Sequence, residues 1–158
     1  AGDTDAAGVG YDASREADPG RAALLRAEIL LAEGDAREAL SAVERMPNRN
    51  IPYMSDTEGM LLYNLPPMKD VGARALIATG QLFRAIETYE KLLIVDHTTK
   101  NRFLVHPLYH LRLGELFEAK GWEPKARDQY ERYLAVCGDG SCPHTETARA
   151  RLQKLRPA

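Results

Sequence analysis

The sequence has no long apolar run and no excess of positive charge, and both absences limit its partners. None of its 158 residues belongs to a run that approaches the roughly 18 consecutive apolar residues of a membrane-spanning helix, so we expect no transmembrane segment. Its 21 lysines and arginines are outnumbered by 23 aspartates and glutamates, which gives a net charge of −2. Such a chain offers no basic surface to phosphate backbones, and we expect no nucleic-acid partner.

The motifs of catalytic sites are also missing. The sequence contains no glycine-rich phosphate loop after a strand, no nucleophile elbow and no HExxH. His106 and His110, four residues apart at a predicted helix start, would place two imidazoles on one face, as zinc sites do. No third ligand lies nearby, so we expect a capping role for His106 and a packed or surface position for His110. The sequence predicts no enzyme, no metal site and no cofactor.

Signals for β-strands are absent, because the apolar residues recur with a helical period and without strict alternation. Gly34, Gly80 and Gly121 each close an apolar-periodic stretch, as glycines that end helices do. Another amphipathic stretch follows each glycine, and Asp35 and Glu38 have the spacing of a capping box. The sequence therefore predicts an all-α chain of helical hairpins.

The three predicted hairpins share one pattern of small and large residues. The side chain is small seven residues before each stop glycine and five residues after it; it is larger four residues before and nine residues after. The small positions are Ala27, Ala73, Gly114, Ala39, Ala85 and Ala126, and the larger ones are Leu30, Leu76, Phe117, Val43, Tyr89 and Tyr130. Small residues let two helix backbones approach closely. We therefore interpret Gly114 as a packing requirement, rather than an accidental helix glycine that costs about 1 kcal/mol.

This pattern resembles the tetratricopeptide repeat. Leu113-Gly114-x-x-Phe117, followed by Gly121, Ala126 and Tyr130, is similar to the L-G-x-x-Y…A-x-x-x-F motif of that family. TGQLFRAIETYEKLL and RAEILLAEGDAREALSAV give two further copies. The family's tryptophan position is held by other residues, and the third unit has no closing proline. The last unit, with its flanking segments, also resembles C-terminal repeat modules of bacterial multidomain signalling and cell-envelope proteins.

The resemblance implies an α-solenoid of about three hairpins with a C-terminal capping helix. In such a solenoid the first helix of each hairpin builds a concave binding face. The positions expected on that face are Leu24, Glu28, Leu31, Asp70, Arg74, Ile77, Leu111, Glu115 and Glu118. These residues lack the lysines and asparagines of the family's chaperone-tail clamps, so we expect a different protein ligand, or else a solvated face without one.

The repeats are expected over residues 20–136, with departures at both ends and between the units. Residues 1–19 are either half of a further repeat, completed by a longer chain or another protein, or a loose leader. The stop glycines lie 46 and 41 residues apart instead of about 34. We therefore expect insertions at 47–67 and 95–107, which either pack against the solenoid edge or bind a partner. The cysteine loop and capping helix are expected over 137–158.

Cys137 and Cys142 enclose a Gly-Asp-Gly-Ser turn. They can form a disulfide that joins the last hairpin to the final helix, remain reduced thiols, or supply half of a metal site with His144, although the spacing fits zinc poorly. A disulfide would require an oxidising compartment, so the expected location would be periplasmic or extracellular. The missing initial methionine fits a mature protein as well as a piece of a longer one.

The sequence predicts a non-catalytic protein-interaction scaffold or adaptor subunit, acting through its concave face and its insertions. Its partners would be proteins, within a multi-subunit complex or a longer chain. The alternative is a ligand- or metal-binding accessory protein that uses residues 95–110 and the cysteine loop.

Overall fold

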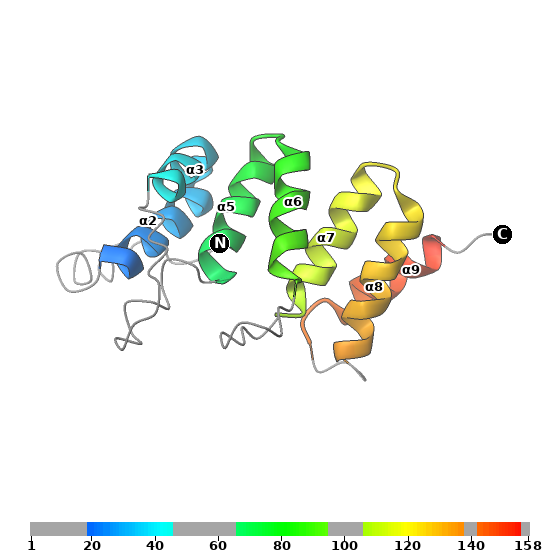
Figure 1. The fold of residues 1–158 in the computed structure, drawn as a ribbon. Helices are drawn as coiled ribbons and strands as arrows, with labels where there is room; N and C mark the ends of the chain where they lie inside the picture. The colour runs from blue at the N-terminus through cyan, green and yellow to red at the C-terminus, as the bar shows by residue number, and fades with distance from the viewer. Residues whose placement is uncertain (1–18, 46–65, 95–105, 138–141, 156–158) are drawn as a thin grey trace. The chain divides into compact units, whose positions relative to one another are not determined.

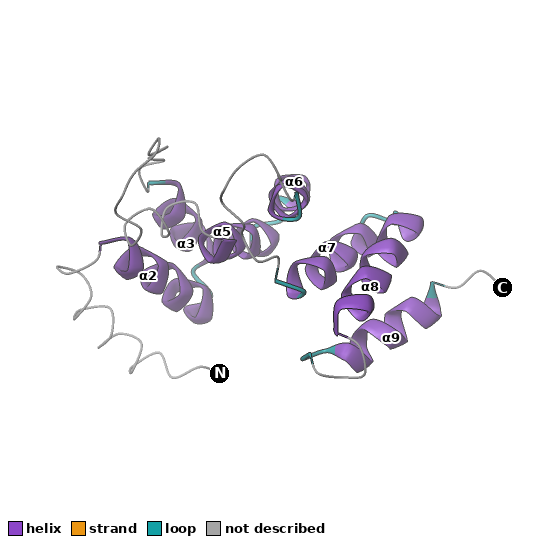
Figure 2. Ribbon diagram, turned by 60° about the horizontal axis from the view of Figure 1, so that its bottom comes forward, coloured by secondary structure: helices purple, strands orange, loops and turns teal. Residues whose placement is uncertain are grey.

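The computed structural model describes residues 19–45, 66–94, 106–137 and 142–155. Every regular element within these segments is an α-helix, and none is a strand (Figures 1 and 2). The expected all-α class is therefore confirmed. The chain divides into two compact units, Ala1–Ala85 and Ile86–Ala158.

Three expectations lie outside the described residues. They are the half-repeat or leader at the N-terminus, in residues 1–18, and the greater part of both insertions, in residues 46–65 and 95–105.

The first unit holds α2 (Pro19–Glu33), α3 (Ala36–Glu44), α5 (Pro66–Ala78) and the first residues of α6 (Leu82–Leu92). Helices α2 and α3 form a hairpin, and α5 packs against both of them. Their contact is lined with small residues, since Ala27, Ala39 and Ala75 have no exposed surface. The capping box expected at Asp35 is wrong, because its side chain makes no capping hydrogen bond and the backbone there is not extended.

The second unit holds the rest of α6, α7 (Leu108–Ala119), α8 (Glu123–Cys137) and α9 (Thr145–Lys154). Helices α7 and α8 form a hairpin, and α9 packs on α8. The rings of Tyr89 and Tyr109 lie 6.0 Å apart and place α6 beside α7. The expected helix at the C-terminus is confirmed, with Ala148 fully buried on its inner face.

The same turn ends the first helix of each hairpin. Gly34, Gly80 and Gly121 have φ values of +90°, +78° and +72°. Residues other than glycine rarely adopt this backbone conformation. In each turn the residue after the glycine donates its N–H to the carbonyl five residues earlier, as from Trp122 to Phe117 at 2.8 Å. This is the Schellman pattern, so the prediction that these glycines end helices is confirmed.

Gly114 is a packing requirement, as predicted. A Cβ atom at this position would lie 2.7 Å from Cε1 of Tyr130, and real Cβ atoms do not approach other atoms so closely. Tyr130 has no exposed surface. Because residue 114 has no Cβ atom, the ring of Tyr130 on α8 can pack directly against the backbone of α7.

Among the described residues, no helix combines the length and the apolar character needed to cross a membrane.

Candidate functional site

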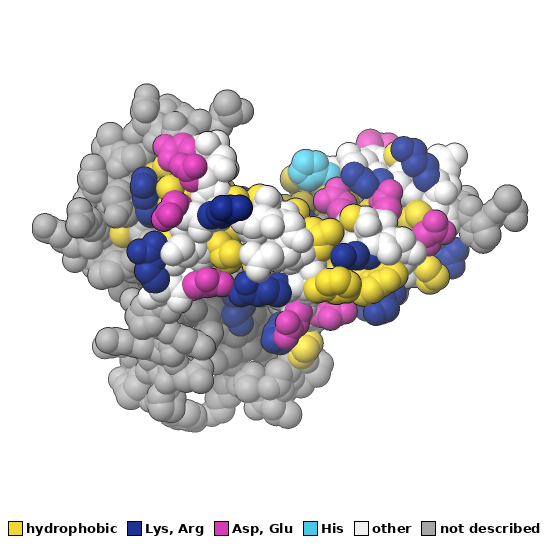
Figure 3. Space-filling view, turned by 90° about the horizontal axis from the view of Figure 1, so that it is seen from above, with side chains coloured by type: hydrophobic (Ala, Val, Ile, Leu, Met, Phe, Trp, Pro, Cys, Tyr) yellow, Lys and Arg dark blue, Asp and Glu magenta, His cyan; other side chains and the backbone are white. Residues whose placement is uncertain are grey.

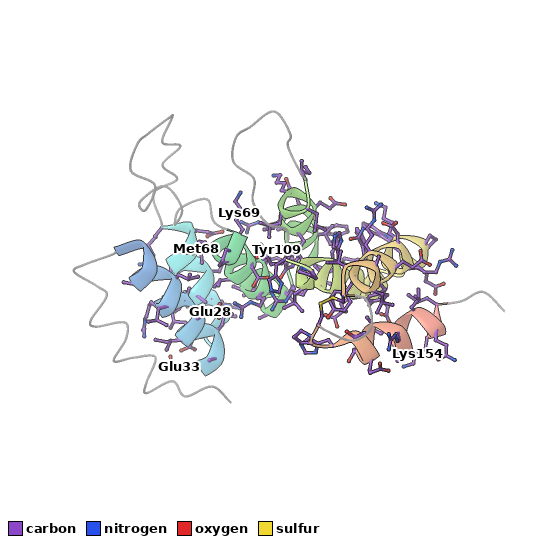
Figure 4. All side chains as sticks on the ribbon, turned by 90° about the horizontal axis from the view of Figure 1, so that it is seen from below. Glu28, Glu33, Met68, Lys69, Tyr109 and Lys154 are labelled. Atoms are coloured by element: carbon purple, nitrogen blue, oxygen red, sulfur yellow. A yellow bond between two sulfur atoms is a disulfide. The ribbon has the colours of Figure 1, made fainter. Side chains whose placement is uncertain are left out.

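In the first unit, three charged residues of the expected concave face pair with one another. Arg74 of α5 donates a hydrogen bond to the carboxylate of Glu28 on α2 and forms an ion pair with it. Glu28 lies on the side of α2 that is next to α5 (Figure 4). Nε of Arg74 also donates to Oδ2 of Asp70 at 3.2 Å, one turn earlier on α5. Asp70 is buried. The charges of this face therefore join two helices, and an incoming ligand would have to compete for them.

Aliphatic side chains lie beside these charges. Leu24 and Leu31 are four residues before and three residues after Glu28, and therefore share its side of α2. Ile77 is three residues after Arg74 and shares the corresponding side of α5. All three aliphatic side chains are half-buried. The expected face of the first unit thus has aliphatic side chains next to the ion pair of Glu28 and Arg74.

In the second unit, the residues expected on the concave face are either buried or paired with α9 of the same chain. Leu111 is buried. Arg151 of α9 places Nη1 2.9 Å from Oε2 of Glu118 and Nη2 3.5 Å from Oε1 of Glu115. Glu118 also accepts a hydrogen bond of 2.6 Å from the hydroxyl of Tyr130. These acids therefore hold α9 in place, a role that the sequence did not reveal.

The electrostatics of this cluster follow from its burial and its hydrogen bonds. Burial alone would raise the pKa of Glu118, but the hydrogen bonds from Tyr130 and Arg151, with the positive charges of Arg151 and Lys154, outweigh it and lower that pKa below its ordinary value. Burial, together with the hydrogen bond to Glu118, raises the pKa of Tyr130. Glu118 is therefore charged and Tyr130 neutral over the physiological pH range.

Glu118 should make stability depend on pH in a predictable direction. Because its pKa is lower in the folded protein, its stabilisation is complete above the pKa of the unfolded chain and is lost as pH falls through the folded pKa. We expect the wild type to exceed Glu118→Gln by about 1 kcal/mol in free energy of unfolding at neutral pH. This difference should vanish in acid. Urea titrations across pH measure it, with the exposed Glu131→Gln as control; a difference independent of pH would contradict the assignment.

The cysteine loop ties α9 to α8. Cys137 and Cys142 form a disulfide with Cα atoms 5.3 Å apart, which is the first of the three alternatives that the sequence left open. The hydroxyl of Tyr133 donates to the carbonyl of Pro143, and Oγ1 of Thr145 donates to that of Cys142 at 2.8 Å. A disulfide sulfur offers no thiolate to a metal, so the alternative of half a metal site is not realised by these two cysteines.

The histidines at the start of α7 serve the fold. Nδ1 of His106 accepts the N–H of Leu108 at 3.2 Å, which is the capping role predicted for it. Nδ1 of His110 lies 2.8 Å from Oε1 of Gln129, and the ring is half-buried. Both predictions are confirmed. Over the described segments, no group of three or more histidine, cysteine, aspartate or glutamate residues is arranged to hold a metal ion.

The structure also forms a groove that sequence reasoning missed. It lies along α6, α7 and α8 in the second unit and has a volume of 490 Å³. Its lining is apolar at the base, with charged residues around it: Glu90, Leu93, Ile94, Leu113, Phe117, Pro124, Lys125, Asp128 and Gln129. Its signal in the sequence is the pair of adjacent apolar residues directly after α6, Leu93 and Ile94.

The comparisons with known proteins identified no relative. The chain matches no family model, no curated protein and no solved structure.

Proposed function

We propose that this chain is a non-catalytic protein-interaction module, an adaptor built as an α-solenoid of tetratricopeptide-like hairpins. The repeated Schellman turns support the hairpin assignment. So does the close contact between Gly114 and Tyr130, which has the small-against-large form of the predicted template. In this proposal the fold supplies a rigid surface, and binding is its function.

The observation that carries the proposal is the composition of the expected concave face in the first unit. Half-exposed Leu24, Leu31 and Ile77 surround the pair formed by Glu28 and Arg74. Because Arg74 is already paired with both Glu28 and Asp70, a ligand would gain most from contact with the aliphatic side chains. We therefore propose a protein partner that presents an apolar helix face or an extended apolar segment.

The balance of surface charge is consistent with this kind of ligand. Figure 3 shows acidic and basic side chains interspersed with hydrophobic ones on the face in view. The mixture contrasts with the single-sign fields that attract polyanions or polycations. We therefore propose a partner recognised by shape and apolar contact.

The disulfide bears on where the module works. A bridge between Cys137 and Cys142 persists in oxidising surroundings and is reduced in most cytosols. We propose a periplasmic or extracellular location for the domain.

Site-specific photo-crosslinking in the native host tests the proposed face without a known partner. A photoreactive residue at Leu24 or Ile77 should give a discrete crosslinked species, because both side chains lie on the face. The matched control is Phe83, an apolar residue of the same unit that is 63% exposed. Ile77→Asp should abolish the crosslink from Leu24 while the circular dichroism spectrum stays unchanged.

Two outcomes would remove the support for this face. One is crosslinking from Phe83 as strong as that from Leu24, since a specific face would not react equally at both positions. The other is a crosslink from Leu24 that persists in the Ile77→Asp variant.

A further inference from the structure

The groove of the second unit lies on a different side of α7 from the acids that bind α9. Leu113 and Phe117 line it, one turn apart on the same side of the helix. Glu115 and Glu118 point toward Arg151. At about 100° per residue, these two pairs lie on largely opposite sides of α7. The groove is therefore separate from the region that the capping helix covers.

The groove has an apolar base and an exposed apolar wall. Leu113 and Phe117 are buried and form the base. Leu93 and Ile94 line the groove from the end of α6, and Ile94 is 70% exposed. Ile94 is thus a large, exposed aliphatic side chain beside a groove that is large enough to hold such a side chain. This combination is typical of interfaces in which a side chain of one surface fills a groove of the other.

The walls of the groove carry opposite charges that form no ion pair within the described part of the unit, apart from Asp128 on the α8 side, which pairs with Arg132. Glu90 lies on the α6 side, and Lys125 on the α8 side. Lys125 places Nζ 5.3 Å from the ring centre of Phe117 and 5.1 Å from that of Trp122. In the part of the chain that the structure describes, neither Glu90 nor Lys125 forms an ion pair.

We propose that this groove binds the same groove of a second copy of the chain. A two-fold axis parallel to the groove places the α6 wall of each copy over the α8 wall of the other. Glu90 of each copy then faces Lys125 of the second copy, and Ile94 of each enters the opposite groove. Every contact occurs twice in such an interface. This two-fold interface places each wall against the other kind of wall, so it requires opposite charges on the two walls. A foreign peptide would require only that each wall match the peptide's own charges.

The state of association of the full chain tests the proposal. Sedimentation equilibrium over a concentration series should show a reversible monomer–dimer equilibrium. Ile94→Asp should weaken the dimer on the order of a hundredfold, because a buried aliphatic group is lost twice. The matched control is Val136→Asp, which changes another aliphatic side chain of this unit that is 61% exposed and lies outside the groove. It should leave the equilibrium unchanged.

Charge reversal provides a second arm that does not rely on an apolar substitution. Glu90→Lys and Lys125→Glu should each weaken the dimer about tenfold by placing like charges opposite one another. The double variant should restore the wild-type affinity within a few-fold, because the pairs re-form between copies. Since Glu90, Lys125 and Ile94 are all exposed, each variant should fold, and circular dichroism verifies this.

Three results would overturn the proposal. They are a wild type that remains monomeric over the whole series, a dimer that Ile94→Asp does not weaken more than Val136→Asp, and a charge-reversed double variant no tighter than the single variants. The last result would show that Glu90 and Lys125 do not meet across the interface.

Discussion

Replacing Gly114 with alanine should lower the free energy of unfolding by about 2 kcal/mol, although alanine is the better helix former by about 1 kcal/mol. The new Cβ atom would lie 2.7 Å, 2.9 Å and 3.1 Å from three ring atoms of Tyr130. That ring has no exposed surface, and Glu118 holds its hydroxyl. It cannot rotate away without breaking this bond, so α7 and α8 must separate. Chemical denaturation with circular dichroism measures the effect.

Gly72→Ala is the matched control for this prediction. Gly72 is also a buried helical glycine, but a Cβ there would meet a single atom, Cγ1 of Val43, at 3.2 Å. The improved helix propensity should offset so small a contact, and we expect a change within about 0.5 kcal/mol of zero. If Gly114→Ala proved as harmless as Gly72→Ala, the close contact with Tyr130 would not limit the packing of α7 on α8.

A double variant separates the clash from other effects of the substitution. Tyr130→Leu removes most of the ring that Gly114 admits, and should by itself destabilise the unit through the cavity that it leaves. Gly114→Ala should then cost much less in the Tyr130→Leu background than in the wild type. The coupling energy expected between these touching residues is on the order of 1 kcal/mol. Additive effects would show that the two side chains do not compete for one space.

Removing the disulfide should lower the free energy of unfolding by about 2 kcal/mol, the chain-entropy value for so short a closed loop. The variant Cys137→Ala with Cys142→Ser does this while avoiding a buried hydroxyl, because Cys137 is only 1% exposed. The wild type should lose the same amount on reduction, whereas the variant should not respond to reductant. Guanidinium titrations with and without dithiothreitol measure both quantities.

The loss should be concentrated in α9. The loop of the disulfide leads directly into this helix, which is also attached by the packing of Ala148 and by the ion pairs of Arg151 with Glu115 and Glu118. Hydrogen exchange in α9 should therefore accelerate more than that in α7. Arg151→Met, which keeps the bridge and removes the ion pairs, serves as the comparison. Two free thiols in protein alkylated in its native compartment would contradict both the bridge and the proposed oxidising location.

The hairpins could be predicted because their determinants are local. Gly34, Gly80 and Gly121 end their helices for a reason that lies in their own backbone, since φ near +80° suits glycine. The pairing of Cys137 with Cys142 likewise spans few residues. Local reasoning failed at Asp35, where the capping-box spacing is present but the side-chain hydrogen bond is not. The backbone of the tight turn, and not the residue type, decides that bond.

The candidate site was predicted less completely, for a physical reason. Period and spacing indicated which side of α7 would hold Glu115 and Glu118, but not that Arg151 would occupy it. Arg151 is 33 residues from Glu118. A charged residue on a helix surface has many possible partners, and only the packing of α9 selects one.

The sequence by itself determined the helical class, the ends of the three first helices and the small-against-large contact at Gly114, because each depends on backbone conformation or on a repeated spacing. Only the tertiary structure decided which charged residues neutralise one another and where apolar surface stays exposed, as in the groove beside Ile94. Those features depend on how α6, α7, α8 and α9 pack within the second unit. That packing brings together residues whose separation along the chain carries no signal of their contact.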